Sequence, residues 1–227
     1  VAQLMEGFDF FLHTLMPKLL EGSLVTVELI IFSAIPQLLL GTLVAIGRVY
    51  GGRFVSSFCL GYVVFFRGTP LLVLLFILYY GLPSIGLFLP PMVAAVMGFS
   101  LTGGAYHSEY IRGAIQSIKI GQMKAALSLG MSRVKAIVFI IIPQAMRRAL
   151  PGVANEYTYL VKYSSLAFMV TVIELTGAGK LIAGRYFNYT YVFAIVAVFY
   201  LVLVSLVTQL EKFLEKKLSV PGLEAKR

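Results

Sequence analysis

Polar and charged side chains occur within apolar stretches of this sequence, at positions where they could bind a small solute. A charge inside a membrane span costs at least about 2.5 kcal/mol, so such a residue tends to have a function. Asn155 and Glu156 could meet an ammonium group, and Lys162 could meet a carboxylate. The hydroxyl-bearing residues that could line a substrate pathway beside them are Thr69, Ser100, Thr102, Ser164 and Ser165.

Five of these residues also have a purely structural explanation. Asn155 and Glu156 could form a hydrogen bond between helices or lie at the membrane interface. Lys162 could form an ion pair with an acidic residue such as Glu109. The segment around Ser100 and Thr102 holds three glycines, which favour close helix packing as much as a polar lining. The sequence leaves both explanations open.

The sequence offers no arrangement for covalent, redox or metal chemistry. It lacks the G-x-x-x-x-G-K-S/T pattern of a phosphate-binding loop, and no Ser or Cys has the partners of a nucleophile. Its one cysteine, Cys59, lies in an apolar run, and His13 and His107 stand alone. We therefore expect no catalytic residue, no metal site and no cofactor bound by this chain.

The elements that carry these residues are expected to be membrane helices. Hydrophobic residues make up 59% of the chain and charged residues 13%, with a mean hydropathy of +0.89, beyond the range of a soluble domain. A helix needs about 20 residues to cross the hydrocarbon core. We expect an all-α integral membrane protein, one domain over residues 1–227, with five transmembrane helices at about 24–46, 54–82, 90–109, 155–173 and 191–210.

The second of these segments, 54–82, is long enough to suggest two spans, but neither half reaches spanning length. RGTP at 67–70 divides it, because Pro70 removes a backbone donor and Gly68 relaxes the chain beside it. We therefore expect one tilted or kinked helix. Before the first span, the amphipathic segment 8–20 is expected to lie along the outer interface.

The basic residues predict the orientation of the spans. Of the 19 Lys and Arg residues, 14 fall on one side of the expected topology, and Lys18, Lys180 and Arg185 fall on the other. Because cytoplasmic loops carry the excess of Lys and Arg, the N-terminus is placed outside and the C-terminus in the cytoplasm. The net charge of +9 follows from this asymmetry and indicates membrane orientation rather than nucleic-acid binding. The loop at about 112–148 then lies in the cytoplasm.

A short helix is expected within this cytoplasmic loop. Gln122 to Leu129 makes about two helical turns between glycines, and Gly130 suits the left-handed position after a helix. Ser132 can accept an amide hydrogen bond and begin the next helix, so the two helices should meet at a corner.

The short helix carries a narrow apolar stripe that a partner could approach closely. Residues three and four apart share one face of a helix, and those of the stripe are Met123, Ala126, Leu127 and Gly130. Further along, Pro143 is expected to interrupt the next helix, and Pro151 with Gly152 to mark the start of the fourth span.

The segment KAALSLGMSRVKAIVFIIIP, residues 124–143, resembles the EAA loop of bacterial ATP-binding-cassette (ABC) importer permeases. That loop has an Ala pair, a Gly, an Ile and a Pro at fixed spacing, which here are Ala125, Ala126, Gly130, Ile140 and Pro143. Over residues 20–215 or so the chain is similar to the polar-amino-acid branch, whose permeases carry histidine, glutamine, glutamate or arginine. The matching motifs are FRGTPLL at 66–72, EYIRGAIQSI at 109–118, GQ at 121–122, PQAMRRALP at 143–151, NE at 155–156 and LVKYSSL at 160–166.

The resemblance implies a multi-pass permease subunit of the bacterial cytoplasmic (inner) membrane that imports polar or charged amino acids of the glutamate, glutamine, aspartate, arginine and histidine class. It implies a second permease subunit in a homo- or heterodimer, two ATPase subunits that hold ATP and Mg²⁺, and an extracytoplasmic amino-acid-binding protein. The short helix becomes a coupling helix that enters a cleft of the ATPase. The residues implied in this contact are Gly121, Gln122, Met123, Lys124, Ala125, Ala126, Leu127, Gly130, Met131, Ser132, Arg133 and Pro143.

Lys124 departs from the motif, because it stands where the EAA loop has Glu. Either the ATPase offers an acidic residue at this contact, or a sister permease subunit supplies the usual Glu. Leu74 and Tyr163 also depart from the family pattern near the expected pathway, so the identity of the amino acid stays open.

Two other classes of protein compete with the importer subunit. An ATP-independent secondary carrier or channel for a small polar solute would place its ordered polar residues at the bilayer midplane. A membrane scaffold would not need RGTP or KYSS within its spans.

Overall fold

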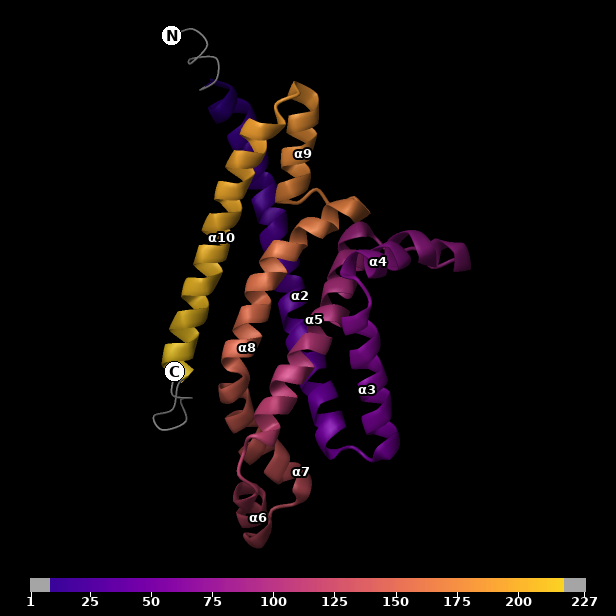
Figure 1. Ribbon diagram of the computed structural model, residues 1–227, viewed down its shortest axis with the longest axis vertical. Helices are drawn as coiled ribbons and strands as arrows, with labels where there is room; N and C mark the ends of the chain where they lie inside the picture. The colour runs from indigo at the N-terminus through magenta and orange to yellow at the C-terminus, as the bar shows by residue number, and fades with distance from the viewer. Residues whose placement is uncertain (1–8, 219–227) are drawn as a thin grey trace. The chain divides into compact units, whose positions relative to one another are not determined.

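The computed structural model describes residues 9–218, and every regular element in that range is a helix (Figure 1). Lipid offers no hydrogen bonds to the backbone, so a helix, which satisfies its own N–H and C=O groups, is the favoured structure for an apolar segment. The elements are η1 (Phe11–Leu15), α2 (Met16–Tyr50), α3 (Arg53–Gly68), α4 (Leu71–Phe76), η2 (Ile77–Gly81), η3 (Leu82–Ile85), α5 (Pro91–Gln116), α6 (Ile120–Ser128), α7 (Arg133–Ala136), η4 (Ile137–Ile141), α8 (Ile142–Tyr163), η5 (Ser164–Val170), α9 (Leu175–Tyr186) and α10 (Tyr189–Leu218).

Three helical stretches in the described range are long and apolar enough to cross a membrane: Phe11–Tyr50, Arg133–Val170 and Tyr189–Leu218. The broken pair Arg53–Gly68 and Leu71–Ile85 would make a fourth. α5, which contains the expected third span, is 26 residues long, but its Gly, Ser, Thr and His side chains lower its hydropathy. The protein is therefore an all-helical membrane protein, whereas the count of five spans and their orientation stay predictions.

The segment 54–82 is not the single tilted helix that the sequence suggested. α3 ends at Gly68, and the chain bends by 100° before the helical stretch Leu71–Ile85. Thr69 and Pro70 both have extended ψ angles, 128° and 131°. A residue before proline is pushed out of the α region by the ring, so RGTP breaks the helix rather than kinking it.

The expectation that Pro143 interrupts the helix was wrong. Helical structure runs without a break from Arg133 to Val170, through both Pro143 and Pro151, so residues 133–148 of the expected loop at 112–148 are part of one long helix. Residues 117–132 connect α5 to this long helix. The span expected over 155–173 lies within the helix up to Val170, and its start at Pro151 stays a prediction.

The π-helical turns explain how helices continue through some of their prolines. Each of the three π-helices, η1, η2 and η4, ends two residues before a proline: Pro17, Pro83 and Pro143. A proline ring collides with the carbonyl four residues earlier in a regular α-helix. The wider π turn moves that carbonyl away, and so the helix passes the proline.

Two further features differ from expectation. The segment 8–20 is not a separate interfacial helix, because from residue 11 onward it is continuous with α2, and Phe8 lies outside the described residues. α9, between the last two long helices, was not expected at all. Thr171 and Phe187, on either side of it, have positive φ angles of 67° and 52°.

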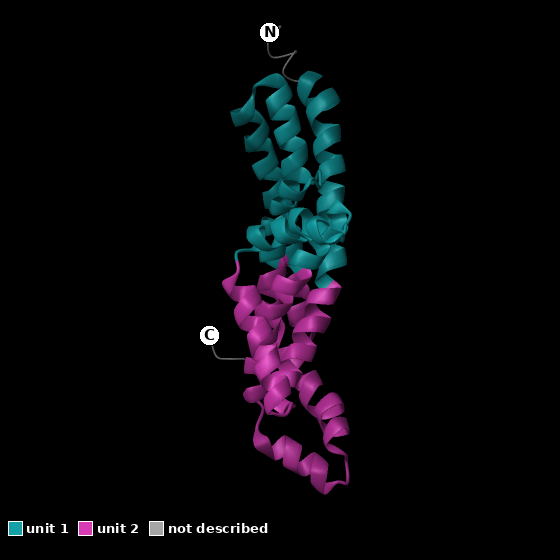
Figure 2. Ribbon diagram, turned by 90° about the vertical axis from the view of Figure 1, so that its right-hand side faces the viewer, with its two compact units in different colours: residues 1–34, 70–99, 158–207 teal, residues 35–69, 100–157, 208–227 magenta. Residues whose placement is uncertain are grey.

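The contacts divide the chain into two compact units, coloured in Figure 2. Unit 1 comprises residues 1–34, 70–99 and 158–207, and unit 2 comprises 35–69, 100–157 and 208–227. The core of unit 1 joins η1 and the start of α2 to α9 and α10, around Leu15, Leu19, Leu175 and Val196. The core of unit 2 is built from Ala45 of α2, the end of α5, Ile141 of η4 and the first half of α8.

Glycines allow α2 and α5 to approach closely in unit 2. A Cβ on Gly41 would lie 2.5 Å from Cβ of His107, and a Cβ on Gly103 would meet the side chain of Gln37. Gly41 of α2 thus packs against His107 of α5, and one turn away Gly103 of α5 packs against Gln37 of α2. Small residues at such contacts are how membrane helices bring their backbones together.

Candidate coupling and translocation site

The short helix expected from the sequence is present as α6, Ile120–Ser128. It begins before Gly121 rather than after it, whereas its C-terminal end is built as expected. Gly130 has φ 79°, in the left-handed region. Its N–H donates to the carbonyl of Leu127 (3.0 Å), and the N–H of Met131 donates to that of Ala126 (3.1 Å). This pair of bonds is a Schellman motif, which ends the helix and satisfies its last carbonyls.

The next helix starts only two residues after that glycine. Ser132 is its N-cap, and the Ser132 hydroxyl accepts a hydrogen bond from the N–H of Lys135 (3.3 Å). α6 also packs against α7 and η4. The corner between α6 and α7 is therefore fixed by backbone conformation, by a cap and by packing, so α6 is held as part of unit 2.

The apolar stripe of α6 does not face outward as a whole, as the sequence suggested, because half of it packs against unit 2. Ala126 is buried and Met123 packs against the core of unit 2, whereas Leu127 and Gly130 are exposed. The stripe is divided because its inner half is needed to hold α6 on the protein. The surface that α6 leaves free carries Lys124, Ala125 and Leu127 instead.

A hydrogen bond closes the base of the hairpin that carries α6. The guanidinium of Arg148, on α8, donates to the carbonyl (2.7 Å) and to the hydroxyl (2.9 Å) of Ser117, just after α5. The two limbs that lead into and out of α6 are therefore joined to each other. Pro143, which was expected to contribute to coupling, is exposed on the second limb.

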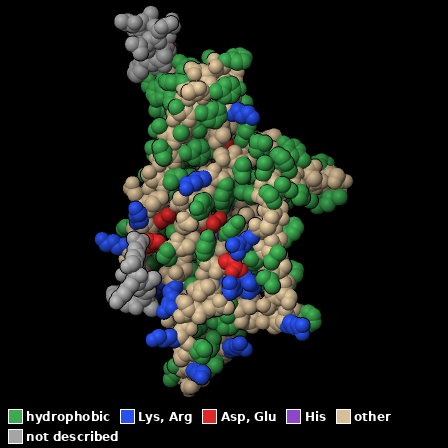
Figure 3. Space-filling model, in the orientation of Figure 1, with side chains coloured by type: hydrophobic (Ala, Val, Ile, Leu, Met, Phe, Trp, Pro, Cys, Tyr) green, Lys and Arg blue, Asp and Glu red, His purple; other side chains and the backbone are tan. Residues whose placement is uncertain are grey.

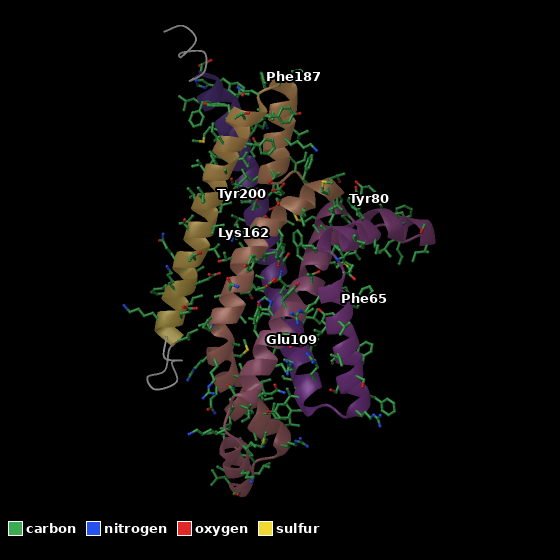
Figure 4. All side chains as sticks on the ribbon, viewed as in Figure 1. Phe65, Tyr80, Glu109, Lys162, Phe187 and Tyr200 are labelled. Atoms are coloured by element: carbon green, nitrogen blue, oxygen red, sulfur yellow. The ribbon has the colours of Figure 1, made fainter. Side chains whose placement is uncertain are left out.

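An ionic cluster joins α2 to the end of α5 in the same unit. Glu109, labelled in Figure 4, accepts hydrogen bonds from Arg48 on α2 and from Arg112 one turn later (2.7 Å). The three side chains are between 14% and 28% exposed, so water screens them only partly. The suggested ion pair between Glu109 and Lys162 does not form, because the Glu109 carboxylate binds Arg48 and Arg112 instead.

The surface around α6 is basic throughout. From residue 110 to 155 the sequence contains no Asp or Glu but seven Lys and Arg residues: Arg112, Lys119, Lys124, Arg133, Lys135, Arg147 and Arg148. All but Arg112 and Arg148 are exposed. On the face drawn in Figure 3, blue side chains gather over the part of unit 2 that holds α6 and α7. A partner that binds this surface closely must offer negative charge.

Five of the eight expected pathway residues lie in unit 2. Ser100 and Thr102 of α5 are each 7% exposed, and neither hydroxyl has a hydrogen-bond partner among residues 9–218. Asn155 is exposed whereas Glu156 is buried, so these neighbours on α8 do not line one surface. Thr69 is half-buried at the break after α3. A buried hydroxyl without a partner is costly, so Ser100 and Thr102 are groups that a polar ligand or water would satisfy.

The other three expected pathway residues lie in unit 1. Lys162, labelled in Figure 4, is exposed, and its ammonium lies 5.1 Å from the ring centre of Tyr159. The Ser164 and Ser165 hydroxyls donate to the carbonyls of Val161 (2.8 Å) and Lys162 (2.9 Å). Both serine hydroxyls thus donate their protons to carbonyls of the preceding turn. Of these three residues, Lys162 is the one whose N–H groups can donate to a substrate.

Sequence reasoning missed a buried acid in unit 1. Glu174 is fully buried at the N-terminus of α9, where its carboxylate accepts hydrogen bonds from the N–H groups of Thr176 and Gly177 (2.9 Å each). The hydroxyl of Tyr200, on α10, donates to it at 2.8 Å. Burial raises the pKa of Glu174 from 4.5 to about 6, although these three hydrogen bonds oppose the rise. The available sequence signal was an acidic residue just before a helical run, a favoured N-cap pattern.

Comparison with known proteins agrees with this architecture. The chain is 38% identical over 217 residues to a probable amino-acid ABC transporter permease protein, PatM, of Vibrio harveyi, covering 94% of this chain and 97% of that protein. It is 46% identical over 156 residues to another, YckA, of Bacillus subtilis, covering 69% of each. A crystal structure of an amino acid ABC transporter with histidines superimposes with a TM-score of 0.80 at 30% identity, covering 89% of this chain and 94% of that one.

A family model, described as the inner membrane component of binding-protein-dependent transport systems, matches residues 37–220. The matched region contains α6 with both of its limbs, the ionic cluster around Glu109, and all eight expected pathway residues. The chain therefore belongs to the family of inner-membrane components of binding-protein-dependent transport systems.

Proposed function

We propose that this chain is the permease subunit of an ATP-driven importer for polar or charged amino acids. The observation that carries the proposal is α6, a short helix with a Schellman motif at one end and a serine-capped corner beside it, presented on a basic surface. A surface loop with no partner does not need to be held this firmly. The relatives named above are amino-acid permeases, which supports the substrate class.

α6 can pass the motion of a partner to the rest of unit 2. Packing and the Schellman corner join it to α7 and η4, the Arg148–Ser117 contact joins the two limbs, and Glu109 links α5 to α2. A push on α6 therefore moves these helices together instead of deforming a loop. In this mechanism two ATPase subunits bind and hydrolyse ATP with Mg²⁺, and this chain hydrolyses none.

The remaining partners follow from the family. A second permease subunit completes the membrane channel, as a homo- or heterodimer, and an extracytoplasmic binding protein delivers the amino acid. The complex lies in the cytoplasmic membrane, surrounded by lipid. Because the α6 surface is basic, we infer that the ATPase cleft is acidic where it meets Lys124.

Lys162 and Asn155 are the pathway residues that we expect to meet the substrate, because both are exposed polar side chains on α8. An ammonium group suits a substrate carboxylate, and an amide can bind either end of an amino acid. Ser100 and Thr102 supply unpartnered hydroxyls on α5. Glu156, Ser164 and Ser165 are buried or already hydrogen-bonded, so we assign them to support of the pathway wall.

Reconstitution tests the proposal directly. The permease is placed in liposomes with the ATPase and the binding protein encoded beside it, and uptake of radiolabelled amino acids is screened with ATP inside. We expect uptake of a polar or charged amino acid that requires ATP and both partners. Uptake without ATP or without the ATPase would instead support a secondary carrier or a channel.

A matched pair of lysines tests the role of Lys162. Lys162 and Lys180 are both exposed, both lie in unit 1, and both lie over an aromatic ring, at 5.1 Å and 4.9 Å from its centre. Lys162→Gln should raise the KM for uptake by about tenfold, the loss of one charge-assisted hydrogen bond, whereas Lys180→Gln should leave it unchanged. Equal effects of the two substitutions would remove Lys162 from the pathway.

A further inference from the structure

The contacts around Glu174 fasten α9 to two other elements of unit 1. Besides its bond to Glu174, the Tyr200 hydroxyl lies 2.9 Å from the hydroxyl of Thr176. The N–H of Leu175 donates to the Thr26 hydroxyl on α2 (3.2 Å). α9 is thereby tied at its first turn to α2 and α10, with Tyr200 labelled on α10 in Figure 4.

The segment that contains α9 is bounded by unusual backbone. Thr171 and Phe187 are the two non-glycine residues with positive φ in residues 9–218, and one lies on each side of α9. A positive φ is disfavoured for any residue with a Cβ, and most of all for a β-branched one such as Thr171. Such residues persist where surrounding contacts hold them, and they cluster at segments that switch between conformations.

The carboxylate is held in a way that suits a contact made and broken during function. Two of its partners are amides of α9 itself and the third is the Tyr200 hydroxyl, so separating α9 from α10 breaks only the bond to Tyr200 and leaves both of those groups able to bond water. α9 also packs closely on α2, where a Cβ on Gly22 would lie 2.9 Å from Cβ of Ala178. Leu175 and Ile182 of α9 also pack in the core of unit 1, so α9 can move only as one rigid body.

We propose that Glu174 is a positioning residue that latches α9 to α10, and that release of this latch lets α9 move between Thr171 and Phe187. The role of the movement in transport rests on the proposed function, since α9 directly follows the segment that holds Ser164 and Ser165. The latch itself does not depend on transport and can be measured in its absence.

Protonation supplies a readout that a merely structural residue would lack. The pKa of Glu174 is raised to about 6 by burial, while exposure to water would return it towards 4.5. The state that binds the proton more tightly is favoured by acid, so lowering the pH from 7.5 to 5 should stabilise the latched state by about five- to tenfold. Charged or titratable side chains on the surrounding elements include Lys18, Glu21 and Glu28 of α2, Lys180, Arg185 and Tyr186 of α9, and Tyr189, Tyr191 and Tyr200 of α10. Of these, only Tyr200 contributes to the shift in the pKa of Glu174.

Hydrogen–deuterium exchange of the full ATPase complex in lipid nanodiscs tests the latch. In Glu174→Gln, amides of residues 175–186 should exchange about 10- to 100-fold faster than in the wild type, while those of α2 and α10 change little. Tyr200→Phe, which leaves the carboxylate capped by both amides, should give a smaller rise in the same segment. Wild-type exchange in α9, corrected for intrinsic rates, should slow between pH 7.5 and 5, and this change should vanish in Glu174→Gln.

Matched controls separate the latch from general loosening. Glu21→Gln removes an exposed carboxylate from α2, and Tyr191→Phe removes an exposed hydroxyl from α10. Neither should alter exchange in α9. The proposal is overturned if Glu174→Gln leaves α9 within twofold of the wild type, if the faster exchange spreads over all of unit 1, or if the pH dependence survives in that variant. Failure of amino-acid uptake with a normal latch would contradict only the proposed transport function.

Discussion

Two glutamates, one in each unit, show how this protein holds an acidic group away from water in two ways. Glu109 in unit 2 is 21% exposed and is bound by two arginines, whereas Glu174 in unit 1 is fully buried and has no cation among its hydrogen-bond partners. Glu109 lies near the base of the hairpin that carries α6, and Glu174 lies at the start of α9.

The difference teaches what each unit needs from its acidic residue. Charge pairs are strong where they are partly desolvated, and losing one partner leaves a charge without compensation. The cluster around Glu109 thus suits a part that must stay together while a force passes through it. Amides and hydroxyls exchange readily for water, so the cluster around Glu174 suits a contact that opens.

The largest expected effect comes from the helix contact of unit 2. Gly41→Ala would place a Cβ 2.5 Å from Cβ of His107 and 3.0 Å from the carbonyl of Gly104, neither of which can easily move. We expect a loss of about 3 kcal/mol of stability, measured by thermal unfolding in detergent. The unit 1 counterpart, Gly22→Ala, with its Cβ 2.9 Å from Ala178, should cost less.

Gly61→Ala is the control for both substitutions, because nothing lies within 4 Å of the added Cβ and Ala favours a helix. If Gly22→Ala proved more damaging than Gly41→Ala, unit 1 rather than unit 2 would be the more tightly packed.

The next effect separates the two glutamates. Glu109→Gln leaves Arg48 and Arg112 without their carboxylate and should cost about 2 kcal/mol, less than for a fully buried pair because the three side chains are partly exposed. Thermal unfolding from pH 5 to 8 should show a constant loss in this variant. For Glu174→Gln, the loss of stability relative to the wild type should instead be largest at low pH. Because burial raises the pKa of Glu174 to about 6, the wild type gains stability as the pH falls and the carboxylate is protonated, whereas glutamine does not titrate. Identical pH profiles for the two variants would remove the distinction between the clusters.

A smaller change in stability should have a large effect on coupling. Gly130→Asp puts a Cβ on a residue with φ 79° and should cost about 1 kcal/mol, so the protein should still insert and fold. The corner between α6 and α7 would be strained, and we expect substrate-stimulated ATPase activity of the complex to be lost.

Gly86→Asp is a matched control for the α6 corner, since Gly86 has φ 83°, open space around it, and lies in unit 1. Full stimulation in Gly130→Asp, or an equal loss in Gly86→Asp, would show that the corner has no special part in coupling.

The smallest change in stability is expected at the α6 surface. Lys124→Glu replaces one exposed charge by another and should alter stability by less than about 0.5 kcal/mol. We expect it to weaken ATPase binding, measured by co-purification at increasing salt, because it sets like charges against each other at the contact. Lys180→Glu in unit 1 should have no such effect. Tighter ATPase binding by Lys124→Glu would indicate a basic cleft and contradict our assignment of an acidic one.

Some of this architecture could be predicted because it depends on neighbours in the sequence. α6, the left-handed Gly130 and the Ser132 cap were expected from a glycine and a serine at fixed offsets, and each is present. Helix ends are local structures whose hydrogen bonds span a few residues. The pathway residues stay predictions.

Other predictions were wrong, for reasons that can be identified. Pro143 was taken as a break, but the π turn η4 absorbs its ring. A proline alone does not predict such a turn, because α8 continues through Pro151 without one. RGTP was taken as a kink, yet Thr69 and Pro70 turn the chain by 100°. Lys162 was paired with Glu109 by chemistry alone, while Arg48, 61 residues away in sequence, occupies that carboxylate.

The sequence by itself determined that this is a helical membrane protein with a short, basic helix that ends at Gly130, because hydropathy and helix ends depend on composition and short spacings. Only the tertiary structure decided which acid meets which base, which half of the α6 stripe is buried, and how Glu174 is held. Those outcomes depend on helices distant in sequence coming together, and no local pattern records which side chains they bring into contact.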